Sequence, residues 1–181
     1  MPNPWTDGLQ ELIQQAMDHL ALGGDFDRRI AMISVDNSVE LMIKTYLGLP
    51  ERARGFKEPS RKELEIASES FPGLLDLLQN YATHKITGLS LDDIEWYHRL
   101  RNQLYHSGNG FTVDVSKVET YLQLAISLFE SPFGFLPSIN LRVLRIRKLD
   151  NFSISGTSLN MVYVNNCLLK RDWHIIGSEN T

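Results

Sequence analysis

Residues 95–110, EWYHRLRNQLYHSGNG, have the pattern of a helix that ends in a glycine-rich turn. Apolar side chains recur at the i, i+3 and i+4 spacing of a core-facing stripe, at Ile94, Tyr97, Leu100 and Leu104. Ser90, with Asp93 three residues further on, is a start signal close to a capping box. The glycines after His106 favour the left-handed backbone that stops a helix. The stretch therefore predicts one long helix whose last turns carry polar side chains.

The same spacing predicts helices over most of the chain. Apolar stripes of helical period cover residues 5–22, 25–47, 71–83 and 116–131, and Ser60 with Glu63 predicts a capping box for a short helix between them. We therefore expect an all-α fold, an antiparallel helical bundle of about five helices over residues 1–135. Residues 136–181 have a different character, because apolar and basic residues alternate imperfectly from position 141 to 148. This C-terminal extension is predicted to be a small β-hairpin, a strand exchanged with a partner, or a poorly ordered tail.

Composition limits the classes of protein to which the chain can belong. The single cysteine, Cys167, excludes an internal disulfide framework and a cysteine-rich metal site. No run reaches the length of a membrane span, and the first residues lack the pattern of a signal peptide. The chain has no glycine-rich phosphate loop, no His-Glu-x-x-His zinc helix and no Gly-x-Ser-x-Gly elbow. We therefore expect a cytoplasmic protein that uses no membrane, cofactor or metal.

The net charge of −4 divides unevenly along the chain. Residues 139–181 carry six Lys or Arg and three Asp or Glu, which leaves −7 for residues 1–138. Because phosphate contacts dominate nucleic-acid binding, an acidic body predicts that any RNA is bound only locally. The candidates for a local basic surface are Arg99, in the helix predicted from residues 95–110, and Arg52 and Arg54, in the linker after the second predicted helix. The same residues are also explained as ordinary solvated side chains.

Arg101, Asn102 and His106 are the candidate catalytic residues at the end of the predicted helix. An arginine, a small polar residue and a histidine could hold and attack a phosphodiester. An α-helix turns about 100° per residue, so Arg101 and His106 point about 140° apart on an ideal helix. Either His106 leaves the helical path at the terminus, or two copies of the helix meet and line one cleft. Asn102 and His106 share a helix face with His98.

The spacing of Arg101, Asn102 and His106 resembles the motif of HEPN domains, in which an arginine and a polar residue precede a histidine four to six residues further on. Residues 34–44, SVDNSVELMIK, are similar to the second helix of such domains, and the resemblance covers roughly residues 1–135. It implies a homodimer in which Arg and His of both chains form a composite active site. It also implies metal-independent RNA cleavage. Proteins of this family often act as toxins or anti-phage defence effectors and are restrained by an antitoxin or another regulatory protein.

The resemblance assigns a role to each motif residue. His106 would take the proton from a ribose 2′-hydroxyl, and the 2′-oxygen would attack the adjacent phosphorus and leave a 2′,3′-cyclic phosphate. Arg101 would stabilise charge on the phosphoryl oxygens, and Asn102 would position Arg101, His106 or the phosphate. Tyr105 or Trp96 would stack a splayed base, unless both are buried aromatics. These residues do not specify the RNA, and both tRNA and mRNA are candidates.

Polar residues on the second helix offer two interpretations of Arg101. Either Asn37 or Glu40 orients Arg101 for catalysis, or Arg101 pairs with Glu40 or Asp36 and only ties two helices together. The same helix is more apolar than one face needs, so it is central or contacts both the core and a partner chain. The alternative function is therefore a non-catalytic HEPN-like module that binds RNA or protein, or that dimerises.

Overall fold

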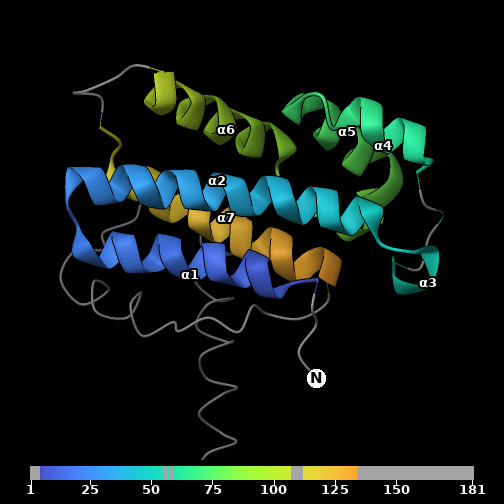
Figure 1. The fold of residues 1–181 in the computed structure, drawn as a ribbon, viewed down its shortest axis with the longest axis horizontal. Coiled ribbons are helices and arrows are strands. Elements are labelled where there is room, and N and C mark those ends of the chain that lie inside the picture. Colours follow the sequence, from blue (N-terminus) through green and yellow to red (C-terminus); the bar gives the residue numbers. More distant parts are fainter. Residues whose placement is uncertain (1–4, 55–56, 58, 107–111, 134–181) are drawn as a thin grey trace, which may run out of the picture. The chain divides into compact units, whose positions relative to one another are not determined.

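Helices make up most of the chain that the computed structural model describes, which is residues 5–54, 57, 59–106 and 112–133 (Figure 1). In chain order they are α1 (Asp7–Leu22), α2 (Asp25–Gly48), α3 (Glu51–Arg54), α4 (Arg61–Ala67), α5 (Phe71–Ala82), the 3-10 turn η1 (Thr83–Lys85), α6 (Leu91–His106) and α7 (Val115–Phe133). The predicted all-α class is confirmed for these residues, which contain no strand.

The predicted C-terminal extension, residues 136–181, lies outside the described residues, and so do its proposed hairpin and exchanged strand. The chain divides into two compact units, Met1–Leu144 and Arg145–Thr181, and every described residue belongs to the first unit. The division at residue 135 stays a prediction. None of the described helices combines the length and the apolar character that crossing a lipid bilayer requires.

The helices α1 and α2 form a hairpin because the chain reverses at two glycines. Gly23 has a φ of 78°, the left-handed conformation that ends α1, and its N–H donates to the carbonyl of His19 at 3.3 Å. Nδ1 of the same histidine lies 2.9 Å from Oδ1 of Asp27 in the first turn of α2. This contact joins the two helices across the turn.

The helix α2 is the central element, with α1 and α7 along one side and α5 and α6 along another (Figure 1). Its largest fully buried side chains are those of Met32, Met42, Ile43, Tyr46 and Leu47. A helix with neighbours on several sides needs apolar residues around most of its circumference. This arrangement explains why α2 is more apolar than one face requires.

Side-chain caps set the starts of two helices where the sequence predicts them. Ser90 Oγ accepts a hydrogen bond from the Asp93 N–H at 3.1 Å, before the first turn of α6. Ser60 and Glu63 form the predicted capping box before α4, with reciprocal hydrogen bonds of 3.2 and 2.8 Å. The α6 cap helps to fix where the candidate residues near the other end of this helix lie.

Candidate functional site

Asp36 lies at the centre of a polar network that joins α2, α6 and α7. Its carboxylate is fully buried, at 0% exposure. Nδ1 of His98 lies 3.0 and 3.1 Å from the two carboxylate oxygens, and Tyr121 donates its hydroxyl hydrogen to Oδ1 at 2.8 Å. Arg101 Nε lies 3.3 Å from Oδ2. A buried charge is costly unless it is paired and hydrogen-bonded, and these three neighbours meet both conditions for Asp36.

The guanidinium of Arg101 is held by both α2 and its own helix. Nη2 donates to Asn37 Oδ1 at 2.8 Å, and Nη1 donates to Asn102 Oδ1 at 3.0 Å. Nε is buried and makes no hydrogen bond within the described residues, although it faces Asp36. The guanidinium carbon also lies 5.8 Å from the centre of the Tyr105 ring. Arg101 is therefore fixed in one orientation, with 21% of its side chain exposed.

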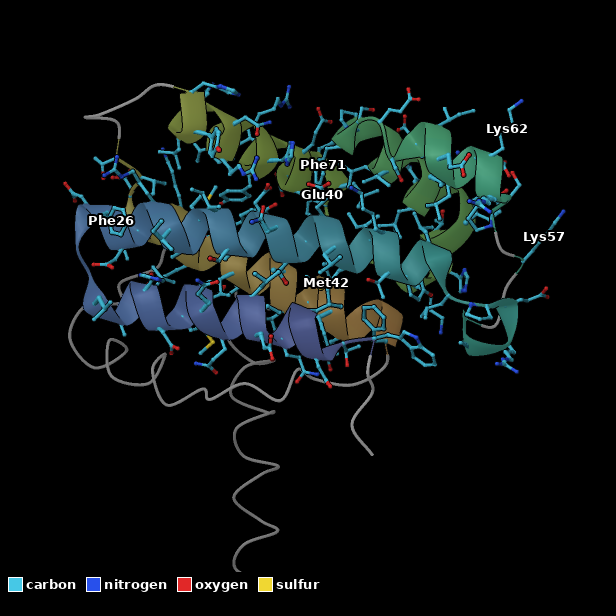
Figure 2. All side chains as sticks on the ribbon, in the orientation of Figure 1. Phe26, Glu40, Met42, Lys57, Lys62 and Phe71 are labelled. Atoms are coloured by element: carbon cyan, nitrogen blue, oxygen red, sulfur yellow. The ribbon has the colours of Figure 1, made fainter. Side chains whose placement is uncertain are left out.

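His98 is fixed by a carboxylate at one edge and by an aromatic ring on one face. Phe71, the first residue of α5, stacks on the imidazole with ring centres 3.9 Å apart and planes 6° apart. The contact with Asp36 requires a proton on Nδ1, which leaves Nε2 unprotonated in the neutral ring. Figure 2 labels Phe71 beside the junction of α2, α5 and α6. His98 is only 14% exposed, so it belongs to the packing between helices.

His106 is the last residue of α6 and is exposed. Its ring meets that of Tyr105 edge to face, with centres 5.8 Å apart, and the ring forms no hydrogen bond with another described residue. Because α6 stays helical as far as His106, this residue does not leave the helical path within the described chain. Arg101 and His106 therefore point about 140° apart, and one copy of the helix does not bring them to one phosphate.

The other polar candidates near the motif have partners of their own. Glu40 pairs with Lys44, with Oε1 and Nζ 2.5 Å apart, and not with Arg101. Figure 2 labels Glu40 on α2. Arg99 is 64% exposed and lies 3.7 Å from Glu95 one turn earlier on α6. Of the two α2 residues predicted to orient Arg101, the structure brings only Asn37 to it.

The basic linker lies away from the motif. Arg52 and Arg54 form part of α3, which follows the C-terminal end of α2, whereas α6 ends above the beginning of α2 (Figure 1). Lys57 and Lys62 lie at the same end as α3, opposite to Phe26 (Figure 2). About 16 Å of helix separates Asn37 from the end of α2, at 1.5 Å per residue. The structure therefore does not place these residues in the site.

Tyr121 and Phe71 were not among the predicted site residues, and Asp36 was predicted only as a structural partner of Arg101. Asp36, Tyr121 and Phe71 form the buried side of the network. The available signal was a carboxylate in an apolar run of α2, because a buried polar group must find partners elsewhere in the fold. No comparable signal marks Tyr121 or Phe71, since aromatic residues on an apolar stripe are ordinary core residues.

Because of Tyr121, we expect the free energy of unfolding to depend on pH in the alkaline range. Burial raises the pKa of the Tyr121 hydroxyl well above its usual value of 10.0, and Asp36 acts in the same direction through its charge and the hydrogen bond. Above about pH 10 the unfolded chain loses a proton that the folded protein retains, so this contribution is complete below that pH and decreases above it.

We therefore expect the free energy of unfolding in urea to fall as the pH rises above about 10, and to fall less steeply in Tyr121→Phe. Tyr121→Phe removes only the hydroxyl, so the difference between the two curves reports on this group. Parallel curves for the two proteins would contradict this assignment.

No group of three or more His, Cys, Asp or Glu side chains suited to a metal ion occurs within the described ranges. Comparison of the chain with protein-family models, with curated proteins and with solved structures finds no match. Over the residues that the structure describes, the fold and the site thus define an all-α bundle with a buried polar network, a fixed arginine and an exposed histidine on one helix.

Proposed function

We propose that this chain is a metal-independent endoribonuclease of the HEPN type. The observation that carries the proposal is that Arg101 is held in one orientation while His106 is exposed. Arg101 is fixed by Asn37, Asn102 and the charge of Asp36, while the His106 side chain is exposed and makes no hydrogen bond to another described residue. Phosphodiester cleavage needs preorganised donors and an available acid–base group, and a second copy of the chain would bring the two together.

The fixed guanidinium keeps the capacity to bind phosphate. Each terminal nitrogen of an arginine carries two N–H groups, and the bonds to Asn37 and Asn102 use one from each nitrogen. The remaining N–H groups can donate to two oxygens of a phosphate in a bidentate manner. Orientation by α2 lowers the entropy that such a contact would otherwise cost.

In the proposed reaction, neutral His106 removes the proton of a ribose 2′-hydroxyl. The 2′-oxygen forms a bond to the adjacent phosphorus, and the bond from phosphorus to the 5′-oxygen breaks. The departing 5′-oxygen takes a proton from water or from the protonated His106 of a second copy. During this displacement Arg101 stabilises the charge on the phosphoryl oxygens. The products are a 2′,3′-cyclic phosphate and a 5′-hydroxyl.

The proposal includes a homodimer with a composite site. Arg101 and His106 diverge on α6, so a second copy supplies the partner residue that one chain cannot. Support for this arrangement comes from α2, whose outward side carries exposed or half-exposed apolar residues at Phe26, Ile30, Ile33 and Leu41. Asn37 lies in the same stripe and contacts Arg101, so a dimer along this stripe would join two motifs.

The biological role that we propose follows the usual role of the family. The protein would act in the cytoplasm as a toxin or an anti-phage effector that cuts tRNA or mRNA, restrained by an antitoxin or another regulatory protein. The charge of −7 over residues 1–138 supports binding of RNA only at a local cleft, or restraint by a basic partner.

A second function has one observation in its favour. Arg101 faces a buried carboxylate and is mostly covered, as expected for an arginine that ties two helices together. In that case the chain would be a non-catalytic module that binds RNA or protein, or that dimerises.

The two functions differ in their response to substitution of Arg101. We expect the wild-type protein to cut an RNA oligonucleotide and to leave the DNA of the same sequence intact, because DNA lacks the 2′-hydroxyl. Arg101→Ala should lower the cleavage rate by about 10²–10³-fold. Arg101→Lys keeps a positive charge beside Asp36 but lacks the planar fork, so it should remain folded and still lose most activity.

Arg61→Ala is the matched control, because Arg61 is 93% exposed on α4 and pairs with Glu65 within its own helix. It should cut as the wild type does. Circular dichroism shows whether each variant is folded. Cleavage of DNA, or full activity of a folded Arg101→Lys, would contradict the proposed mechanism.

A further inference from the structure

Tyr105 lies between the two motif residues and is largely open to solvent. Its side chain is 69% exposed. The Arg101 guanidinium carbon lies 5.8 Å from the ring centre, and the His106 ring meets it edge to face at 5.8 Å. Its hydroxyl makes no hydrogen bond with another described residue. An exposed aromatic ring thus has the two groups of the motif as its neighbours.

The other aromatic residues of α6 are packed. Trp96 is 44% exposed, meets the Tyr97 ring edge to face at 4.9 Å, and has the Lys117 ammonium 5.9 Å from its centre. Tyr97 is buried and stacks on Tyr121 at 4.7 Å. Packing within the bundle therefore explains Tyr97 and covers part of Trp96, but it leaves most of the Tyr105 ring uncovered.

We propose that Tyr105 is a stacking platform for an unpaired nucleobase beside the scissile phosphate. The inference rests on the proposed function, because it takes Arg101 and His106 as the groups that meet the phosphate. Aromatic side chains bind single-stranded nucleic acid by stacking on bases, largely without regard to sequence. A base in a duplex is already stacked and paired, so the platform selects single-stranded RNA, such as loops and tails.

The charge around the ring favours a nucleotide over a protein partner. The Arg101 guanidinium beside the Tyr105 ring is a cation, which complements a phosphate next to the base. An apolar protein contact would instead be expected to extend over neighbouring apolar side chains. On the exposed side of α6, Arg99, Asn102 and Gln103 are polar.

The test uses a fluorescein-labelled single-stranded DNA oligonucleotide of about 12 nucleotides, which the proposed reaction cannot cut, and measures its dissociation constant by anisotropy. Tyr105→Leu should weaken binding about tenfold, and Tyr105→Phe should bind as the wild type does because it keeps the ring. Ile66→Ala, which changes an exposed apolar residue of α4, should leave binding unchanged. Binding of a duplex of the same sequence should not respond to Tyr105→Leu.

Binding and cleavage are measured separately, so failures of the two proposals can be told apart. Loss of binding in Tyr105→Leu, with no RNA cleavage by wild type, supports the platform and rejects the nuclease. Unchanged binding in Tyr105→Leu overturns the platform, whether or not the wild type cuts RNA. Failure of the wild type to bind the oligonucleotide also overturns it. A change from dimer to monomer in Tyr105→Leu, measured by light scattering, would make Tyr105 a subunit contact and overturn the inference.

Discussion

Asp36→Ala is expected to lower the free energy of unfolding by about 3–5 kcal/mol, the cost typical of breaking a buried ion pair. The substitution removes the acceptor that His98 and Tyr121 share and leaves the charge of Arg101 without its buried counterpart. A buried donor left without a partner costs the free energy of its desolvation. Asp36→Asn keeps the shape and one acceptor oxygen, so it should cost less than Asp36→Ala. Urea denaturation at neutral pH measures both effects.

Glu40→Ala provides the matched control for this prediction. Glu40 lies one turn further along α2 and pairs with Lys44 at a position that is about one third exposed, so its removal should cost less than about 1 kcal/mol. Equal losses for the two substitutions would mean that the network around Asp36 has no special role in the fold. An Asp36→Ala protein as stable as wild type would contradict the prediction outright.

His106→Ala is expected to lower the rate of RNA cleavage by about 10²–10⁴-fold, the usual contribution of a general acid or base. It should leave the urea midpoint nearly unchanged, because the His106 side chain is exposed and makes no hydrogen bond with another described residue. This combination separates a chemical role from a structural one. Initial cleavage rates of a labelled RNA oligonucleotide, measured beside the denaturation curves, give both quantities.

Gln103→Ala is the control for His106→Ala, because Gln103 is an exposed polar residue of the same helix. Its cleavage rate and its oligomeric state should match those of the wild type. If His106→Ala cuts RNA as fast as Gln103→Ala does, another group is the general base. A His106→Ala protein that is inactive because it is monomeric would assign His106 to the subunit contact instead.

Most of the helices were predictable because the signals that define them are local, whereas α3 lies in a segment predicted to be a linker. The caps at Ser60 and Ser90 involve residues three apart in the sequence, and the structure forms both. The apolar stripe of α6 is likewise set by helical period, and Ile94, Tyr97 and Leu104 are buried as predicted. Such signals need no knowledge of how one helix packs on another.

The contacts of the site depend on how the helices pack, so they could not be predicted from the sequence. Asn37 and Arg101 are 64 residues apart, and their hydrogen bond requires a particular rotation of α2 against α6. Positions 36 and 40 differ by only about 40° around a helix. Helical period therefore could not determine whether Asp36 or Glu40 would face Arg101.

The same reasoning applies to His98. Its spacing from Asn102 and His106 indicated a shared face, yet it packs between α2 and α5 because Asp36 and Phe71 offer a carboxylate and a ring at that level. Neither neighbour is close to His98 in the sequence. The proposed catalytic group at His106, by contrast, needed no tertiary contact to be identified.

The central claim, that Arg101 and His106 form a ribonuclease site, is tested most directly by the ends of the RNA that the protein produces. Purified wild type and His106→Ala, both shown to be folded and of the same oligomeric state, are incubated with total RNA in the presence of EDTA. Mass spectrometry of the products is expected to show 2′,3′-cyclic phosphate ends with wild type and none above background with His106→Ala. Intact RNA with wild type, or equal cleavage by both proteins, would contradict the claim.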